Sequence, residues 1–406
     1  MSESEAVIQS SEGPPRWVRS PESLHELVAR TAGARIIAVD SESDSLHHLP
    51  EKVCLVQVAH EDGCMFLVDP LSLPDLRPLG PILADPGIVK VFHGASYDLA
   101  SMKRDFGFKF AGIFDTMLAA QFLGLPELGL HALLGRFFGI TPGRSRQKDD
   151  WAVRPLRPEQ EAYAAEDVRY LIPLHGRLRG ELLAHGREAW LAEECQALEA
   201  LPPAERVFDP EEYLRVRGAK DLDRRGLAVL RELFVAREAW AREAGRPPFK
   251  VLGSEALIRL AMERPRSLKA LLGVPGCSPK VLQRYGDRLV AALARAQAVP
   301  ESDLPYYPRP KRPRVSPATQ RRIEALVAWR AEAAAGLGLD PGLVIPRRLI
   351  ERLAEEVPAT PEQLERVEGL RRWRVEAFGV AIREVLAACD DRTAASKASG
   401  ERKGSA

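Results

Sequence analysis

The sequence predicts a mixed α/β domain in the N-terminal half of the chain, followed by a half that is built only from helices. Three observations support this prediction. Short runs rich in β-branched and apolar residues alternate with helical segments up to about residue 200. From residue 206 onward the strand-like runs stop. The helical half also repeats itself, because residues that lie 93 positions apart carry similar side chains.

Four strand-like runs precede most of the helices of the α/β domain. They cover residues 35–40, 53–59, 64–69 and 88–93. A Gly-containing segment between the second and third runs is typical of a hairpin turn. After the fourth run, Gly94 permits a turn into a helix, for which Ser96 is the expected N-cap. Helices are expected over 96–105, 116–123, 128–138 and 158–184, and Asp115 is the expected N-cap of the second.

The repeat defines two copies of one small helical module. A shift of 93 residues superimposes the two segments without a gap over some sixty residues. The shift pairs Leu230 with Ile323, Leu260-Ala261 with Leu353-Ala354, Pro265 with Pro358, Gly276 with Gly369, and Tyr285-Gly286 with Phe378-Gly379. Agreement at hydrophobic, Gly and Pro positions is the signature of a duplicated structural unit.

Composition shifts give the expected boundaries. The N-terminal segment is acidic and polar, the segment between the modules is basic and rich in proline, and the C-terminal tail is rich in Ser, Ala and Lys. We expect a disordered N-terminus (1–15), the α/β domain (16–205), the first module (206–298), a stiff extended linker (299–314), the second module (315–390) and a disordered tail (391–406).

Charge and cysteine content exclude several classes of protein. The 406 residues include 58 Lys and Arg against 57 Asp and Glu, so the chain is not a polycation. Its five cysteines form no CxxC pair, which argues against a disulfide framework or a zinc knuckle. We find no apolar run long enough for a membrane span and no signal peptide, and we expect a cytoplasmic protein.

Two acids at the end of the first strand-like run are the strongest candidates for chemistry. Asp40 and Glu42 are two residues apart, so in a strand both carboxylates point to the same side. Two such acids repel each other unless a cation lies between them, and Mg²⁺ or Mn²⁺ prefers oxygen ligands of this kind. The alternative is an exposed strand end with two solvated acids.

Two further fragments carry acids near helix starts or on a helix face. Asp98 falls in the first turn of the helix after Gly94, and Tyr163 and Asp167 are four residues apart on one helical face. Each alone is also explained by helix stabilisation or by a buried hydrogen bond. Together with Asp40 and Glu42 they supply four carboxylates and a phenol, which suit two-metal phosphodiester hydrolysis.

These fragments resemble the three motifs of DEDD-superfamily exonucleases of the tyrosine subgroup. The motifs are Asp40-Ser-Glu42, His93-Gly-Ala-Ser-Tyr-Asp98 and Tyr163-Ala-Ala-Glu-Asp167. The repeated module resembles the helicase-and-RNase-D C-terminal (HRDC) domain, and an exonuclease domain followed by two such modules is the arrangement of the bacterial ribonuclease D family. The resemblance implies a ribonuclease H-like mixed sheet flanked by helices, followed by two all-α HRDC domains.

The resemblance also implies an activity. Asp40, Glu42, Asp98 and Asp167 would bind two Mg²⁺ or Mn²⁺ ions, and Tyr163 would orient or deprotonate the attacking water. The enzyme would remove 5′-mononucleotides from the 3′ end of RNA, with tRNA precursors as its substrates. Two alternatives stay open: an exonuclease of the same chemistry acting on DNA, and a catalytically silent RNA-binding scaffold.

Four further residues are candidates for contacts with the substrate. His93 ends the fourth strand-like run, where a structural role is the alternative. Gln147, Lys148 and Trp151 lie between predicted helices. A lysine can pair with a phosphate and a tryptophan can stack on a base, so these residues are expected at the border of the substrate site.

Overall fold

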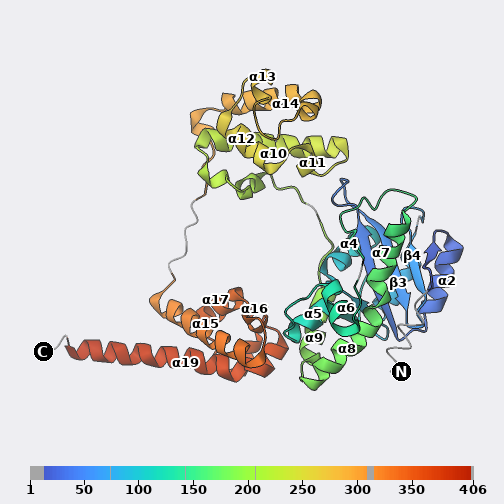
Figure 1. Ribbon diagram of the computed structural model, residues 1–406. Coiled ribbons are helices and arrows are strands. Elements are labelled where there is room, and N and C mark those ends of the chain that lie inside the picture. Colours follow the sequence, from blue (N-terminus) through green and yellow to red (C-terminus); the bar gives the residue numbers. More distant parts are fainter. Residues whose placement is uncertain (1–12, 74, 142, 206, 309–314, 404–406) are drawn as a thin grey trace.

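The computed structural model describes residues 13–73, 75–141, 143–205, 207–308 and 315–403, with side chains described up to residue 389 in the last helix. Most of the expected disordered N-terminus, 1–12, and the end of the linker, 309–314, lie outside the described residues. An α/β domain and two helical modules occupy separate regions of the molecule (Figure 1). No described helix combines the length and the apolarity that crossing a membrane requires.

One six-stranded mixed sheet forms the centre of the α/β domain, with the strand order β1-β4-β3-β2-β5-β6. β3 is antiparallel to β2 and β4, whereas the pairs β1–β4, β2–β5 and β5–β6 are parallel. The four predicted strands are confirmed as β2–β5, and β1 and β6 are additions of three residues each. The strands are β1 Arg16–Val18, β2 Ile36–Ser43, β3 Val53–His60, β4 Met65–Val68, β5 Val89–Phe92 and β6 Ile113–Asp115.

Eight α-helices accompany the sheet in the described part of this domain. α7 packs across β2, β3 and β4, whereas α8 packs on β2 and β5 (Figure 1). The helices are α2 Pro21–Thr31, α3 Gly80–Ala84, α4 Ser96–Phe106, α5 Thr116–Phe122, α6 Leu130–Phe138, α7 Pro158–Arg169, α8 Leu171–Ala184 and α9 Glu188–Glu199.

The prediction of one helix over 158–184 is wrong, because the chain breaks at Tyr170 (φ −106°, ψ 0°) between α7 and α8. Pro173 explains the break, since it has no N–H to continue the hydrogen bonding of α7 and is tolerated only in the first turn of a new helix.

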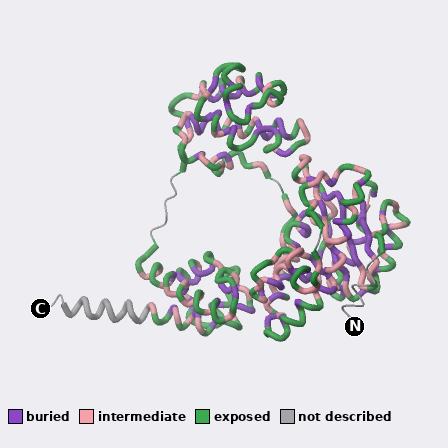
Figure 2. Tube along the Cα trace, viewed as in Figure 1, coloured by how far each residue is buried: buried purple, intermediate pink, exposed green. Residues whose placement is uncertain are grey.

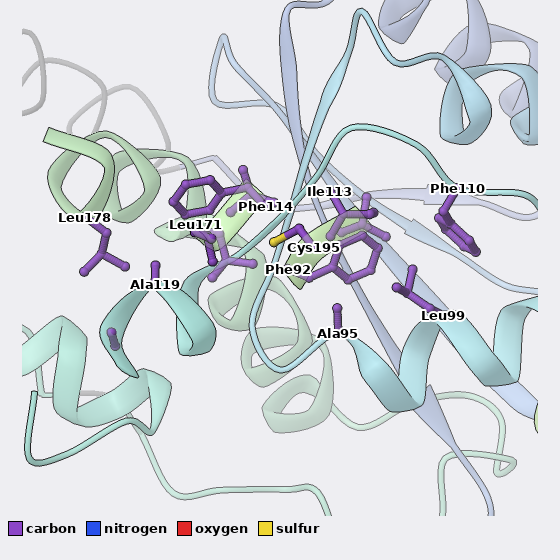
Figure 3. Packing of buried hydrophobic residues seen from close by; sticks show 14 of the residues in the cluster. Phe92, Ala95, Leu99, Phe110, Ile113, Phe114, Ala119, Leu171, Leu178 and Cys195 are labelled. Carbon is purple, nitrogen blue, oxygen red and sulfur yellow. The ribbon is translucent and has the colours of Figure 1, made fainter. Parts of the chain in front are cut away.

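Buried residues of the sheet and its helices form a continuous core, drawn in purple in Figure 2. Figure 3 shows the part beneath the end of β5, where Phe92 packs with Ile113 and Phe114 of β6, with Leu99 of α4 and with Cys195 of α9. Close packing of this kind leaves little freedom to the backbone. The strand end that precedes Asp98 is therefore held by the core.

Both helical modules have the same five helices, which confirms the repeat. Each helix of the second module begins 93 residues after its counterpart in the first. The first module comprises α10 Arg224–Ala244, α11 Pro248–Val251, α12 Ser254–Glu263, α13 Leu268–Leu271 and α14 Pro279–Ala298. The second comprises α15 Pro317–Leu337, α16 Pro341–Val344, α17 Arg347–Glu356, α18 Pro361–Glu365 and α19 Arg372–Lys403.

The linker and the C-terminal tail differ from the expected conformations. The start of the linker is not fully extended, because residues Glu301–Asp303 form a short 3₁₀ helix, and Arg224 donates hydrogen bonds to the carbonyl oxygens of Glu301 (3.0 Å) and Leu304 (2.7 Å). The expected disordered tail, 391–406, is helical to Lys403 as the end of α19. Alanine and lysine favour the helix there, and no proline interrupts it.

Candidate active site

The first acidic pair lies on β2, in the middle of the sheet. In the ladder with β3, Asp40 is opposite Gln57 and Glu42 is opposite Leu55, and the register shifts only after Glu42. Alternation along the strand puts both carboxylates on one face, as predicted. This is the face on which α7 packs.

Asp115 fixes the turn that carries Asp98. Gly94 has a φ of 74°, which favours glycine, and the chain enters α4 directly afterwards. The expected N-cap role of Ser96 is wrong, because Ala95 holds the cap position and makes no side-chain bond there. Instead the Asp115 carboxylate accepts hydrogen bonds at 2.8–3.2 Å from the backbone N–H groups of Gly94, Ala95, Met117 and Leu118. Its predicted role as the N-cap of α5 is confirmed.

All five predicted catalytic residues line one cavity of about 610 Å³. Carboxylate oxygens of Asp40, Glu42 and Asp167 lie within 4.8 Å of one another. Asp98 completes the acidic wall and accepts a hydrogen bond of 2.5 Å from Ser41 Oγ. Tyr163 comes from α7, one helical turn before Asp167. Strand β2 and helices α4 and α7 thus each contribute to the same cavity.

All four carboxylates have a raised pKa. Burial is the largest cause for each, and it raises the pKa of Asp98 to about 6 and that of Asp167 to about 7. The pKa values of Asp40 and Glu42 are raised well above their usual range by burial and by the neighbouring acids. Each group is more easily protonated than a solvated acid, chiefly because burial disfavours its charged form.

This acidic cavity suits divalent cations. Among the described residues that line it there is no Lys or Arg, so the protein supplies no positive side chain to offset the carboxylates. Hard cations such as Mg²⁺ and Mn²⁺ take carboxylate oxygens as ligands, and a bound cation would remove the repulsion that raises these pKa values. Asp40, Glu42, Asp98 and Asp167 are the residues that could hold it.

Tyr163 is buried beside this cluster, and its phenol is suited to hydrogen bonding. Burial is the largest cause that raises its pKa, followed by the charges of Asp167 and Glu42. A raised pKa keeps the phenol protonated at neutral pH. Tyr163 can therefore orient a water molecule but is a poor base.

The structure corrects the expectation for Trp151. This side chain has an exposed fraction of 0% and packs on Tyr163, with ring centroids 6.2 Å apart. It cannot stack on a base, because the apolar cluster beneath α7 encloses it. Its position is fixed by Arg154, which donates to the backbone oxygen of Trp151 (2.7 Å) and pairs with the buried Asp69 (2.8 Å).

The other predicted substrate contacts lie at the cavity or near it. His93 lines the cavity, and its Nδ1 is 2.9 Å from Thr116 Oγ1. Burial lowers the pKa of His93, so the ring is neutral at neutral pH. Gln147 also lines the cavity, whereas Lys148 is exposed outside the lining.

Sequence reasoning missed several lining residues, among them the polar side chains of Tyr97, His131 and Ser145. Tyr97 is 45% exposed, and its phenol oxygen is 2.9 Å from Ser43 Oγ. Tyr97 could have been found, because it precedes Asp98 within a fragment that was already singled out. His131 is a lone histidine in an amphipathic helix, and no local pattern distinguishes it.

Known protein families match both the α/β domain and the two helical modules. The family model for 3′-5′ exonucleases matches residues 15–183, and the HRDC domain model matches residues 226–293 and 319–386. Ribonuclease D of Pseudomonas paraeruginosa is 32% identical over 376 residues, which cover 91% of this chain and 97% of that protein.

Two solved structures are also similar. Escherichia coli RNase D, described as an exoribonuclease involved in structured RNA processing, is 26% identical with a TM-score of 0.65, covering 92% of this chain and 99% of that one. The catalytic core of RRP6 from Trypanosoma brucei is 29% identical with the same TM-score, covering 71% and 81%. With an exonuclease domain, two HRDC domains and relatives matched over almost their whole length, the chain belongs to the ribonuclease D family of 3′→5′ exoribonucleases.

Proposed function

We propose that this enzyme trims the 3′ ends of tRNA precursors and releases 5′-mononucleotides by a two-metal mechanism, with Mg²⁺ or Mn²⁺ as the cation. One observation carries the proposal: four carboxylates and a phenol from β2, α4 and α7 converge on a single cavity without a Lys or Arg among its described lining residues. We assign Asp40, Glu42, Asp98 and Asp167 as metal ligands and Tyr163 as the residue that orients the attacking water.

The residues divide the chemistry between them. When bound, a pair of divalent cations activates the attacking water and stabilises the leaving oxygen. Tyr163 can hold that water by a hydrogen bond from its phenol, whose pKa is raised chiefly by burial. Neutral His93 donates from Nδ1 to Thr116, since the Thr116 hydroxyl itself donates to Phe92 O, and its Nε2 can then accept a hydrogen bond from the terminal nucleotide. Gln147 and Lys148 border the RNA, where Lys148 can pair with a phosphate.

The choice of substrate rests on the family and on the domain arrangement. We propose that residues 16–205 form the exonuclease domain, and that the HRDC domains, 206–298 and 315–390, hold the structured body of the RNA while its 3′ end enters the cavity. A tRNA precursor combines a structured body with a 3′ extension. The five cysteines are free, which fits a reducing compartment, and we propose the cytoplasm.

A 5′-labelled tRNA precursor with a 3′ trailer tests this proposal. It is compared with the mature tRNA, with an unstructured RNA that has the trailer sequence, and with the DNA of that sequence, each in Mg²⁺ and in Mn²⁺. We expect the trailer to be shortened stepwise and the mature end to resist. With a second, uniformly labelled precursor, the released product should co-migrate with a 5′-mononucleotide.

Other outcomes identify the alternatives. Faster degradation of the DNA than of either RNA would show that the enzyme acts preferentially on DNA. Retained binding of the precursor without cleavage in either metal would leave a silent RNA-binding scaffold. Equal degradation of the precursor and the unstructured RNA would remove tRNA precursors as the preferred substrate while leaving the exoribonuclease activity in place.

A further inference from the structure

The two HRDC domains present the same surface to the exonuclease domain. In each, the first helix ends at a glycine with a left-handed backbone, Gly245 (φ 60°) or Gly338 (φ 64°), and a short helix follows, α11 or α16. We call residues 244–250 the first corner and the equivalent residues 337–343 the second corner. Both corners contact loops of the exonuclease domain (Figure 1).

The first corner contacts loop 44–50, which follows β2. The backbone N–H of Leu49 donates to the carbonyl oxygen of Gly245 at 3.1 Å, and the Leu49 side chain packs against the hydrophobic core of the first HRDC domain. Lys250 Nζ donates to His47 Nδ1 at 2.9 Å. Backbone, apolar and charged contacts therefore join the same seven-residue loop to this corner.

His47 also links this corner to the segment that carries Gln147, another part of the cavity lining. Its Nδ1 accepts from Lys250, so in the neutral ring the proton is on Nε2, which donates to the carbonyl oxygen of Lys148 at 2.9 Å. Lys148 is next to Gln147, which lines the cavity. One side chain thus links the first HRDC domain to both the loop after β2 and the segment before α7.

The second corner contacts the end of α5, at Phe122, and loop 123–128, which follows it. The buried Arg187 joins the two segments, since its Nη1 donates to Phe122 O and its Nη2 to Leu337 O, both at 2.7 Å. Gly124 lies so close to Gly338 that a Cβ at Gly124 would clash with the carbonyl oxygen of Gly338. The contact therefore depends on the absence of a side chain at Gly124.

Both loops continue directly into the walls of the candidate active site. The first contributes Ser45 and Leu46 to the lining, next to Ser43 at the end of β2. The second leads into Gly129, Leu130 and His131 at the start of α6. Equivalent surfaces of the two HRDC domains thus contact two separate segments of the exonuclease domain that both border one cavity.

We propose that the HRDC domains position the active-site walls through these corners, and that Lys250, His47 and Gly124 are positioning residues for hydrolysis. The proposal rests on the proposed function, since it concerns the same site. In this proposal both corners are occupied by contacts with the exonuclease domain, so that RNA binds to other faces of the HRDC domains. The simpler view, in which these domains only grip RNA, predicts no effect on the bond-breaking step.

The test measures the single-turnover rate constant at saturating enzyme, for a tailed RNA and for a dinucleotide. A cavity of about 610 Å³ can hold a dinucleotide, which leaves nothing for the outer faces of the HRDC domains to bind. We expect Lys250→Ala and His47→Ala to lower this rate about 10-fold to 100-fold on both substrates, because small misplacements of reacting groups cost rate at saturation. Lys250→Arg, which keeps a donor for His47, should restore it.

Matched variants separate positioning from instability. Lys269→Ala removes an exposed lysine of α13 in the same HRDC domain and should leave the rate unchanged. Gly124→Ala should lower the rate, whereas Gly107→Ala should not, since Gly107 has the same backbone strain (φ 68° against 69°) with nothing within 4 Å of an added Cβ. Unfolding midpoints of Lys250→Ala and Lys269→Ala should agree.

Two outcomes would overturn the proposal, and they differ from a failure of the proposed function. If Lys250→Ala and Gly124→Ala weaken the binding of tailed RNA but cleave it at the wild-type rate once saturated, the HRDC domains only grip RNA. If Gly107→Ala slows cleavage as much as Gly124→Ala, backbone strain and not the corner contact is responsible. Absence of cleavage by the wild-type protein would instead refute the proposed function, and this proposal with it.

Discussion

Four acids share one cavity in this protein, and their side chains destabilise the metal-free fold. Each carboxylate has a raised pKa, which means that its charged form is less favourable in the folded chain than in water. Buried acids with raised pKa values are typical of binding and catalytic sites. Stability and activity should therefore respond in opposite directions when one acid is neutralised.

Asp40→Asn tests this opposition. We expect the exonuclease rate to fall by more than about 100-fold, since even residues that only support metal ligands cost 10-fold to 100-fold. In EDTA, however, the unfolding midpoint should rise by a few degrees, because no charged carboxylate is buried at position 40 and the repulsion by Asp98, Asp167 and Glu42 is relieved. Rate and unfolding are measured on the same preparation. An unchanged midpoint would show that these acids do not repel one another.

The raised pKa values also predict how pH changes the effect of metal. Between the pKa of an unfolded Asp near 3.8 and the folded values of about 6 for Asp98 and about 7 for Asp167, the folded chain binds more protons than the unfolded chain. The stability of the metal-free protein therefore falls as pH rises through this window. Mg²⁺ should raise the unfolding midpoint more at pH 8 than at pH 5.5, as differential scanning calorimetry would show. An equal increase in the unfolding midpoint at both pH values would contradict the assignment of these acids as metal ligands.

Local spacing made some of these residues predictable. The two-residue period of a strand places Asp40 and Glu42 on one face wherever the strand lies, and the four-residue spacing does the same for Tyr163 and Asp167. Trp151 was misassigned because its burial depends on α7, which folds over it from a later part of the sequence. A tryptophan in a loop looks the same in sequence whether it is covered or exposed.

At the scale of secondary-structure elements, Asp115 is the central residue, because its carboxylate accepts backbone hydrogen bonds at the starts of two helices. Asp115→Ala should destabilise the protein by about 2 kcal/mol, at about 1 kcal/mol for each helix start that loses its acceptor. Activity should also fall, because the turn before Asp98 loses its anchor. Chemical denaturation and the RNA assay check both effects. Asp75→Ala is the control, since Asp75 is a surface acid paired with the exposed Arg77, and it should change neither.

Element boundaries were predictable where the local signal was strong. The strands β2–β5 carry runs of apolar residues, whereas β1 and β6 have only three residues each and take their conformation from β4 and β5. The N-cap at Ser96 was wrong because a carboxylate from another element, Asp115, already serves the N–H groups there. Such long-range caps leave no trace in the local sequence.

At the scale of the whole molecule, the second HRDC domain is firmly attached to α9 of the exonuclease domain. Trp190 and Trp373 stack with ring centroids 4.7 Å apart, and Arg374 pairs with Glu194 at 2.6 Å. Glu193 accepts hydrogen bonds from the backbone N–H groups of Arg372 and Trp373 at the start of α19. These residues bury an aromatic contact and cap a helix across the domain boundary.

Trp373→Ala should loosen this attachment. The side chain is 2% exposed, so we expect a loss of about 3–5 kcal/mol in the free energy of unfolding, together with faster amide exchange in α9 and α19. The equivalent position of the first HRDC domain holds the exposed Lys280, which provides a matched control. Lys280→Ala should change stability by less than about 0.5 kcal/mol. Similar effects of both substitutions would show that Trp373 does not attach the domain.

The duplication was visible in the sequence, but the attachment was not. A shift of 93 residues reveals two modules because their cores use the same positions. The two modules differ at many positions, and the sequence does not single out the position that holds Trp373 in one and Lys280 in the other. Its importance is visible only in the structure, where Trp190 of α9 stacks on Trp373. Contacts between domains depend on surfaces that the internal repeat does not constrain.

The most direct test of the whole account is a time course on a 5′-labelled RNA with a single-stranded 3′ tail. Wild-type and Asp40→Asn proteins are compared in Mg²⁺, in Mn²⁺ and in EDTA. We predict a ladder that shortens from the 3′ end, that is abolished by EDTA and restored by added metal, and that is absent with the variant. Intact RNA in every lane, with binding retained in a gel shift, would contradict the assignment of this cavity as a metal-dependent exoribonuclease site.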